Sequence, residues 1–187
     1  MLKNELRTKY KNLRAGITPP RASDLSLMLA NQILKIPIWD FFYFHVFLGS
    51  PQLKEVDTLP LITILQARDK HVLVPRVSGP DSLEHYLLTD ATHLAMNRWG
   101  IAEPQDGIQV PEQKIDVVFL PLLAFDLSGN RVGYGKGFYD AFLEKCRPDT
   151  LKIGLSYFGA EESPIGDVRE EDKKLDYCIS PERIYEF

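Results

Sequence analysis

Hydrophobic residues near the N-terminus recur every three or four positions, the spacing of one face of an α-helix. These residues are Leu2, Leu6, Tyr10, Leu13 and Ile17. The pattern predicts an amphipathic helix that ends before the pair Pro19-Pro20. Lys3 and Arg7 are four residues apart, so both project from one side of this helix. A second set of apolar positions predicts a second helix that stops near Pro37, with the residues Leu25, Met28, Leu29 and Ile33.

Apolar runs of strand length follow these two helices. Residues 41–48 form a continuous apolar and aromatic run, which is typical of a strand buried on both faces. Further strands are expected at residues 71–77, 82–88, 115–121, 151–157 and 176–180, and further helices from about residue 58 and over residues 137–146. This alternation predicts an α/β fold: one three-layer domain over residues 1–187, with a mostly parallel sheet and helices on both faces.

The expected fold also indicates where a ligand would bind. In open α/β sheets, ligands bind beyond the carboxyl ends of the strands. Three segments follow such ends: residues 49–57, the segment after Val77 and the loop after Leu120. We therefore expect these segments to surround a single crevice.

Charge is unevenly distributed along the chain. The net charge is −4, from 22 basic and 26 acidic residues, so the protein as a whole is not built to coat nucleic acid. Residues 1–21 hold six basic residues and one acidic residue, which is +5, and the remainder carries −9. A basic segment on an acidic body suggests an anion site, although a solvated helix face is the plainer explanation of the charge alone.

Several classes of protein are disfavoured by composition. The two cysteines, Cys146 and Cys178, lie far apart, and the four histidines have no metal-binding spacing. The N-terminus has no apolar signal-peptide core, and residues 41–48 are too few to span a bilayer. We expect a soluble protein in the reducing cytoplasm, without a nucleic-acid or membrane partner.

Residues 121–143 hold the most informative pattern. Gly133, Gly135 and Gly137 occupy every second position between a predicted strand and a predicted helix, beside Arg131 and Lys136. Glycines let the backbone approach a ligand, and free N–H groups at a helix start attract phosphate. The segment matches neither the P-loop nor the Rossmann glycine pattern. It is either a phosphate or anion loop, or a tight turn with solvated charges.

The same segment resembles the signature of the 5-formyltetrahydrofolate cyclo-ligase (5,10-methenyltetrahydrofolate synthetase) family, which reads P-x-x-A-F-D-x-x-G-x-R-x-G-x-G-x-G-[YF]-Y-D. The resemblance extends over nearly the whole chain. Its weaker elements come in the family's order: Lys3 with Arg7, then residues 55–58, 74–76, 99–104 and 168–176.

The resemblance implies an enzyme that converts 5-formyltetrahydrofolate and ATP to 5,10-methenyltetrahydrofolate, ADP and phosphate with Mg²⁺. It implies ATP contacts from Lys3, Arg7, Arg131, Gly133, Tyr134, Gly135, Lys136, Gly137, Phe138 and Tyr139. Of these, Arg131, Lys136 and Tyr139 would be the catalytic residues. Leu48, Glu55 and Trp99 would bind the folate, and Asp140 and Asp172 would hold Mg²⁺. The partners would be the two small-molecule substrates, and the resemblance favours a monomer.

Plainer interpretations exist for several of these residues. From spacing alone, Glu55 is better explained as an acidic residue at the N-terminus of a helix, and Trp99 as a core or rim residue. Asp172 lies in a run of acidic and basic residues that resembles a solvated face, and Lys3 and Arg7 could be ordinary surface charges. The sequence also departs from the family pattern, because Phe138 stands where many members carry tyrosine and residues 48–55 form a slightly longer loop.

Two other functions fit the residues less well. Another phosphate-handling α/β protein, such as a relative of sugar-phosphate isomerases or coenzyme A transferases, would not need ATP or the combination of basic helix and glycine loop. A folate- or nucleotide-binding protein without turnover would have little use for Lys136, Asp140 and Asp172 together.

Overall fold

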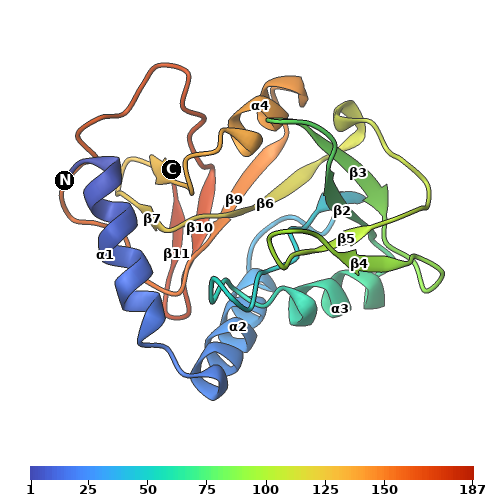
Figure 1. Ribbon diagram of the computed structural model, residues 1–187, viewed down its shortest axis with the longest axis horizontal. Coiled ribbons are helices and arrows are strands. Elements are labelled where there is room, and N and C mark those ends of the chain that lie inside the picture. The colour runs from blue at the N-terminus through green and yellow to red at the C-terminus, as the bar shows by residue number, and fades with distance from the viewer.

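A computed structural model describes all residues from Met1 to Phe187, and its centre is a seven-stranded sheet. Figure 1 shows helices on both sides of this sheet. The strand order is β11-β10-β9-β6-β1-β2-β3. In chain order the strands are β1 (Tyr43–His45), β2 (His71–Val77), β3 (Leu83–Leu87), β6 (Val117–Pro121), β9 (Leu151–Leu155), β10 (Tyr177–Ile179) and β11 (Ile184–Glu186). The inner strands are mutually parallel, and β3 and β11 are antiparallel to their neighbours at the two edges. The predicted α/β class with a mostly parallel sheet is confirmed.

Side chains of the inner strands alternate between two apolar layers, as expected for a sheet that is covered on both faces. On one side, α2 (Pro19–Ile33) and α3 (Leu59–Ala67) pack against positions such as Phe44 and Phe119. On the other side, α4 (Phe138–Lys145) packs against positions such as Val118 and Leu120. The three layers agree with the prediction from the hydrophobic pattern.

The first helix, α1 (Lys3–Ala15), contacts a small hairpin rather than the main sheet. The hairpin consists of β7 (Ala124–Phe125) and β8 (Arg131–Val132). Leu6 and Tyr10 of the helix are buried in a third apolar cluster that includes Val132. This packing brings the basic N-terminal segment beside the loop that follows β8 (Figure 1).

The chain reverses direction across the sheet at one point. From β1 it proceeds outward to β2 and β3, and it then returns to β6 on the opposite side of β1. The two neighbours β1 and β6 are therefore the topological switch point, outside whose carboxyl ends a crevice forms. The structure thus agrees with the prediction that the ligand site lies beyond the carboxyl ends of the strands.

The sequence pattern misjudged some elements. The strand expected over residues 41–48 is only three residues long, because Phe47 and Leu48 leave the sheet to turn toward residues 56–58. Thr58 Oγ1 donates to the Phe47 carbonyl at 2.6 Å, and a Cβ at Gly49 would lie 2.2 Å from the Val56 carbonyl oxygen. The short strands β4 (Leu94–Met96), β5 (Ala102–Pro104), β7, β8 and β11 were not predicted, nor was the 3₁₀ helix Glu112–Lys114.

No helix of the structure combines the length and the apolar character needed to cross a membrane.

A substitution at Gly154 of β9 tests how tightly the apolar layer beneath α4 is packed. A Cβ there would lie 2.5 Å from Leu122 Cδ2 and 3.1 Å from Cys178 Sγ. We expect Gly154→Ala to lower the free energy of unfolding by about 1–3 kcal/mol in urea denaturation, because the core has no room for the methyl group. Gly133→Ala is the matched control, since a Cβ there meets nothing within 4 Å. Equal stability of the two variants would contradict this view of the core.

Candidate active site

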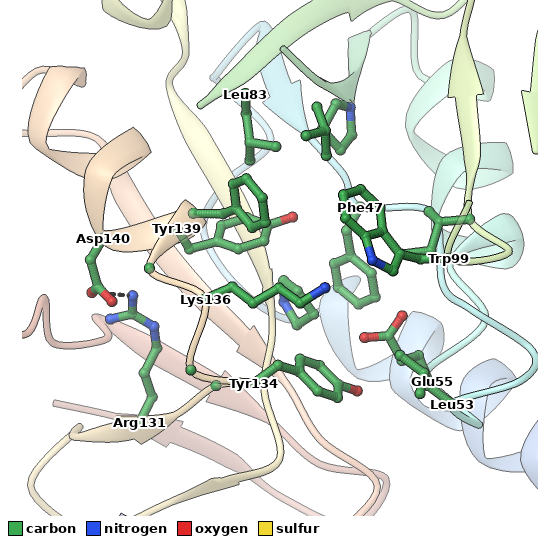
Figure 2. Close-up of a pocket in the computed structure, with 18 of the residues that line it drawn as sticks. Phe47, Leu53, Glu55, Leu83, Trp99, Arg131, Tyr134, Lys136, Tyr139 and Asp140 are labelled. Atoms are coloured by element: carbon green, nitrogen blue, oxygen red, sulfur yellow. Dashed lines mark hydrogen bonds and ion pairs between the residues drawn. The ribbon is translucent and has the colours of Figure 1, made fainter. Parts of the chain in front are cut away.

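A cavity of about 450 Å³ opens at the switch point of the sheet. Residues that follow β1 form its floor, together with the ends of β2 and β6, which are Val77 and Pro121. The basic face of α1, the segment from Gly133 to Asp140 and the hairpin of β4 and β5 form its walls. Figure 2 shows the side chains of Lys136, Tyr134 and Tyr139 directed from one wall toward Phe47, Glu55 and Trp99.

The glycine-rich loop between β8 and α4 adopts a conformation that requires glycine. Gly135 has φ of 87° and Gly137, the residue before α4, has φ of 77°. Both values lie in the left-handed region, which is costly for residues with a Cβ. The loop thereby turns sharply into the N-terminus of α4, where backbone N–H groups lack helical partners.

Arg7 of α1 is docked on this loop. Its Nε donates to the Gly133 carbonyl at 2.9 Å, and its guanidinium would lie 3.3 Å from a Cβ at Gly135. The side chain therefore packs closely against Gly135, where a Cβ would require it to shift. This contact joins the N-terminal helix to the loop, although the two are more than 120 residues apart in the chain.

The acidic residues at this end of the cavity are paired with cations. Arg131 donates to Asp140 at 2.7 Å, and Lys3 forms an ion pair with Asp172. Burial opposes ionisation of Asp172, but the Arg169 N–H and the Lys3 ammonium hold the pKa of its carboxyl below the usual value. No group of three or more His, Cys, Asp or Glu side chains forms a metal site. The two aspartates line the same cavity, and each is paired with a different cation.

Lys136 has no acidic partner within ion-pair distance, unlike Lys3 and Arg131. Its ammonium lies 4.3 Å from the centroid of the Trp99 ring, a cation–π contact between the glycine loop and the opposite hairpin. That hairpin is held over the end of β2 by Glu103, which accepts a hydrogen bond from the Val77 N–H at 3.0 Å. Lys136 is thus an uncompensated positive charge that a bound anion can attract.

The other end of the cavity is apolar and has one carboxylate. Phe47, Leu53 and Trp99 line it, and Glu55 Oε2 accepts a hydrogen bond from the Ser50 N–H at 2.8 Å. Glu55 is not the N-terminal residue of a helix, since α3 starts only at Leu59. The Glu55 carboxylate therefore belongs to the cavity, at the apolar end, as Figure 2 shows.

Tyr134 lies between a buried arginine and Glu55. The Arg14 guanidinium, only 3% exposed, donates to the Tyr134 hydroxyl oxygen at 2.5 Å. Since a guanidinium only donates, the Tyr134 hydrogen is free for a different acceptor. Burial and the nearby Glu55 carboxylate both raise the pKa of Tyr134, so the hydroxyl stays protonated. This arrangement offers Glu55 a donor without placing a cation in direct contact with it.

Two buried histidines lie behind the cavity. His45 and His85 are 0% and 1% exposed, and their Nδ1 atoms are 3.2 Å apart. His45 Nε2 is 3.3 Å from the Tyr139 hydroxyl. Burial lowers the pKa of His45 well below its usual value and that of His85 to about 4. Both imidazoles are therefore neutral at physiological pH.

Comparison with known proteins agrees with this geometry. The model of the 5-formyltetrahydrofolate cyclo-ligase family matches residues 1–161. The chain belongs to this family. It is 31% identical to the 5-formyltetrahydrofolate cyclo-ligase of Escherichia coli strain K12 over 183 residues, which is 93% of this chain and 97% of that protein. A probable 5-formyltetrahydrofolate cyclo-ligase of Schizosaccharomyces pombe is 28% identical and covers 97% of this chain and 96% of its own.

A solved relative has the same fold. The NMR structure of Aquifex aeolicus 5,10-methenyltetrahydrofolate synthetase superposes with a TM-score of 0.84 at 28% identity, covering 100% of this chain and 93% of that one. The family resemblance seen in the sequence is therefore confirmed, and so is the prediction that the protein is a ligase enzyme.

The structure brings every site residue named from the sequence to this one cavity. Leu48 is among them despite the longer loop after it, and so are Trp99 and Asp172, for which plainer positions were considered. Their individual roles in the family's reaction stay predictions. Phe138 lines the cavity as well, and the neighbouring Tyr139 keeps a hydroxyl there.

Sequence reasoning missed part of the lining. Phe47 was hidden in the apolar run of residues 41–48, and the hairpin of β4 and β5 gave no periodic signal. The additional lining residues are Lys11, Phe47, Leu53, Pro75, Val77, Leu83, Asn97, Ile101, Glu103 and Pro121. The strand-end rule alone indicated some of them, since Val77 and Pro121 end their strands.

The buried histidines predict how stability depends on pH. Unfolded histidine titrates near pH 6.5, so between about pH 6.5 and 4 the unfolded chain binds a proton that folded His85 does not. The free energy of unfolding should therefore fall on acidification, by on the order of 3 kcal/mol from His85 alone. Urea denaturation at several pH values should show a smaller loss in His85→Phe than in the wild type.

His93 is the control for this measurement. His93 is exposed, and its hydrogen bond to Asp106 raises its pKa. Its contribution to the free energy of unfolding therefore has the opposite sign, because it is present at low pH and is lost as the pH rises. His93→Gln should therefore not reduce the acid loss. The same acid dependence in His85→Phe and the wild type would contradict the assignment of a neutral buried imidazole.

Proposed function

We propose that the protein catalyses the ATP- and Mg²⁺-dependent cyclisation of 5-formyltetrahydrofolate to 5,10-methenyltetrahydrofolate, with release of ADP and phosphate. One observation supports this most directly. A single cavity has a cation-bearing glycine loop at one end and an apolar, aromatic wall with one carboxylate at the other. A triphosphate fits the first end and the ring system of a reduced folate fits the second.

The proposed reaction activates a poor leaving group. The formyl oxygen of the substrate attacks the γ-phosphorus of ATP, the bond to ADP breaks, and an iminium phosphate forms. The neighbouring folate nitrogen, N10, then attacks the formyl carbon and loses its proton. The C–O bond breaks, and phosphate leaves. Such chemistry asks the protein mainly to position two substrates and to stabilise charge on the transferring group.

The residues at the cationic end suit the phosphoryl transfer. Arg131 and Lys136 would neutralise the transferring group as catalytic residues, and Lys3, Arg7 and the loop backbone would hold the remaining phosphates. The ATP contacts include Gly133, Tyr134, Gly135, Gly137, Phe138 and Tyr139. Asp140 and Asp172 would hold Mg²⁺, which when bound supplies further positive charge to the phosphates.

The other end suits the folate. The Glu55 carboxylate can accept hydrogen bonds from the N–H-rich edge of the pterin ring, and it already faces the Tyr134 hydroxyl. Leu48 and Trp99 would pack against the ring. We further propose that the protein acts as a monomer in the cytoplasm and has only these small molecules as partners.

Product formation tests the proposal. Purified protein with 5-formyltetrahydrofolate and Mg-ATP should generate the ultraviolet absorbance of the methenyl product, and omission of ATP or chelation of Mg²⁺ should abolish it. Thermal shift measurements with ATP and with folate separate binding from turnover. A melting temperature raised by both ligands without product would indicate a binding protein and contradict the proposed function.

Lys136 allows a sharper test. Lys136→Ala should lower the turnover number about 100-fold or more, the effect of removing one charge stabiliser from a transition state. Its side chain is exposed on the loop, so the melting temperature should not change. Lys114→Ala removes an exposed lysine away from the cavity and is the matched control. Near-normal turnover in Lys136→Ala would contradict the role of this lysine.

A further inference from the structure

The buried histidine pair has no part in the reaction proposed above, yet His45 contacts Tyr139, which lines the cavity. His45 of β1 and His85 of β3 lie on the same face of the sheet, on either side of β2. Phe142 of α4 packs against both rings, with centroid distances of 4.9 Å and 4.1 Å. Burial of two polar side chains in such an apolar layer costs free energy unless their nitrogens are hydrogen-bonded.

The distance between the two Nδ1 atoms restricts their protons. At 3.2 Å one Nδ1 donates and the other accepts, so the two rings cannot both be cationic. No carboxylate lies within ion-pair distance of either ring. Lys145 of α4 and Glu84 of β3 are the charged groups that act on His85, and the Glu84 carboxylate is already bound to Arg76 and the Tyr86 hydroxyl. Each ring is therefore neutral, with one N–H.

Only two arrangements of the protons satisfy this contact. In the first, His85 Nδ1–H donates to His45 Nδ1, and His45 Nε2–H donates to the Tyr139 oxygen. In the second, His45 Nδ1–H donates to His85, and the Tyr139 O–H donates to His45 Nε2. The arrangements differ at His85 Nε2, which is buried and has no hydrogen-bond partner.

The unpartnered nitrogen decides between them. In the second arrangement His85 Nε2 carries a hydrogen, so a buried N–H group has no acceptor. In the first it carries only a lone pair. Buried N–H groups without an acceptor are rarer in proteins than acceptors without a donor. The first arrangement is therefore favoured.

We propose that the His45–His85 pair is a positioning element that holds the Tyr139 hydroxyl as a hydrogen-bond donor into the cavity. With its oxygen occupied by His45 Nε2–H, the hydroxyl must direct its own hydrogen elsewhere. No protein group accepts it, and Tyr139 lines the cavity with its hydroxyl on the side of Phe47 (Figure 2). The acceptor is an oxygen of a bound substrate, either the formyl or a phosphoryl oxygen.

Other features of Tyr139 agree with a donor rather than a base. Burial and the Glu55 carboxylate raise the pKa of this hydroxyl, which keeps its proton in place. Phe142 lies one turn further along α4 and packs against Tyr139 as well as the two histidines. The ring is thereby held on the histidine side while the cavity side stays open.

The proton arrangement can be measured in the wild-type protein without any substrate. Nitrogen-15 NMR of the imidazoles distinguishes a nitrogen that carries hydrogen from one that does not. The chain has four histidines: the exposed His71 and His93 can be assigned with His71→Gln and His93→Gln, and His85→Phe identifies the His85 signals and so leaves those of His45. We expect hydrogen on Nδ1 of His85 and on Nε2 of His45. Any other pattern overturns the proposal.

The kinetic consequence rests on the proposed function. Tyr139→Phe and His45→Phe should each lower kcat about tenfold, the value of roughly one hydrogen bond, and should change the KM for ATP to the same extent as each other. The double variant should be no slower than either single variant, because both lose the same hydrogen bond to the substrate. His45→Gln should restore most of the turnover, since its amide can donate to Tyr139. Additive losses, or normal kcat in His45→Phe, would overturn the proposal.

The two experiments separate this proposal from the proposed function. If the wild type forms no methenyl product, the proposed function fails, and the NMR pattern still decides the positions of the protons. If His45→Phe does not fold, His45→Gln and the wild-type spectrum remain sufficient.

Discussion

The contact between Arg7 and the glycine loop is the interaction on which the cavity depends. Its guanidinium would lie 3.3 Å from a Cβ at position 135, so a larger residue there would displace it by a few tenths of an ångström, and its Nε donates to the Gly133 carbonyl. The apolar packing of Leu6 and Tyr10 on the hairpin of β7 and β8 brings α1 to this place. Without that docking, the basic N-terminal segment would have no defined relation to the rest of the cavity.

Charge balance explains how so many cations gather at one end of the cavity before a ligand is present. The ion pairs of Lys3 with Asp172 and of Arg131 with Asp140 each neutralise one positive charge. The charge of Arg14 is compensated differently, because its guanidinium donates to the Tyr134 hydroxyl oxygen and to the Leu122 carbonyl. The Glu55 carboxylate lies near the same hydroxyl and raises its pKa. The loop therefore carries its charge at moderate cost, and Lys136 remains without an acidic partner.

The fold class and the glycine loop were predictable because their signals are local, whereas Leu48, Glu55, Trp99 and Asp172 were named only through the family resemblance. The apolar strands beside amphipathic helices indicated the layered sheet, and the alternating glycines indicated the loop between β8 and α4. The strand-end rule indicated the place where loops meet. These features depend on residues within one turn or one strand of each other.

The remaining features were not predictable from local patterns, because they depend on contacts between distant segments. The end of β1 is decided by Thr58 and Val56, which draw residues 47–49 out of the sheet. The hairpin of β4 and β5 has no periodicity of its own and is held by the bond from Val77 to Glu103. His45 looked like one more residue of an apolar strand, since its partner His85 lies 40 residues away.

The position of the Lys136 ammonium over Trp99 has a consequence for ligand binding. Under the proposed function the lysine serves the nucleotide and the indole serves the folate, so the contact between them covers part of both binding surfaces. A first ligand that separates the two side chains would leave the second ligand without this contact to break. Thermodynamic linkage would then make the two substrates raise each other's affinity, although they bind at opposite ends of the cavity.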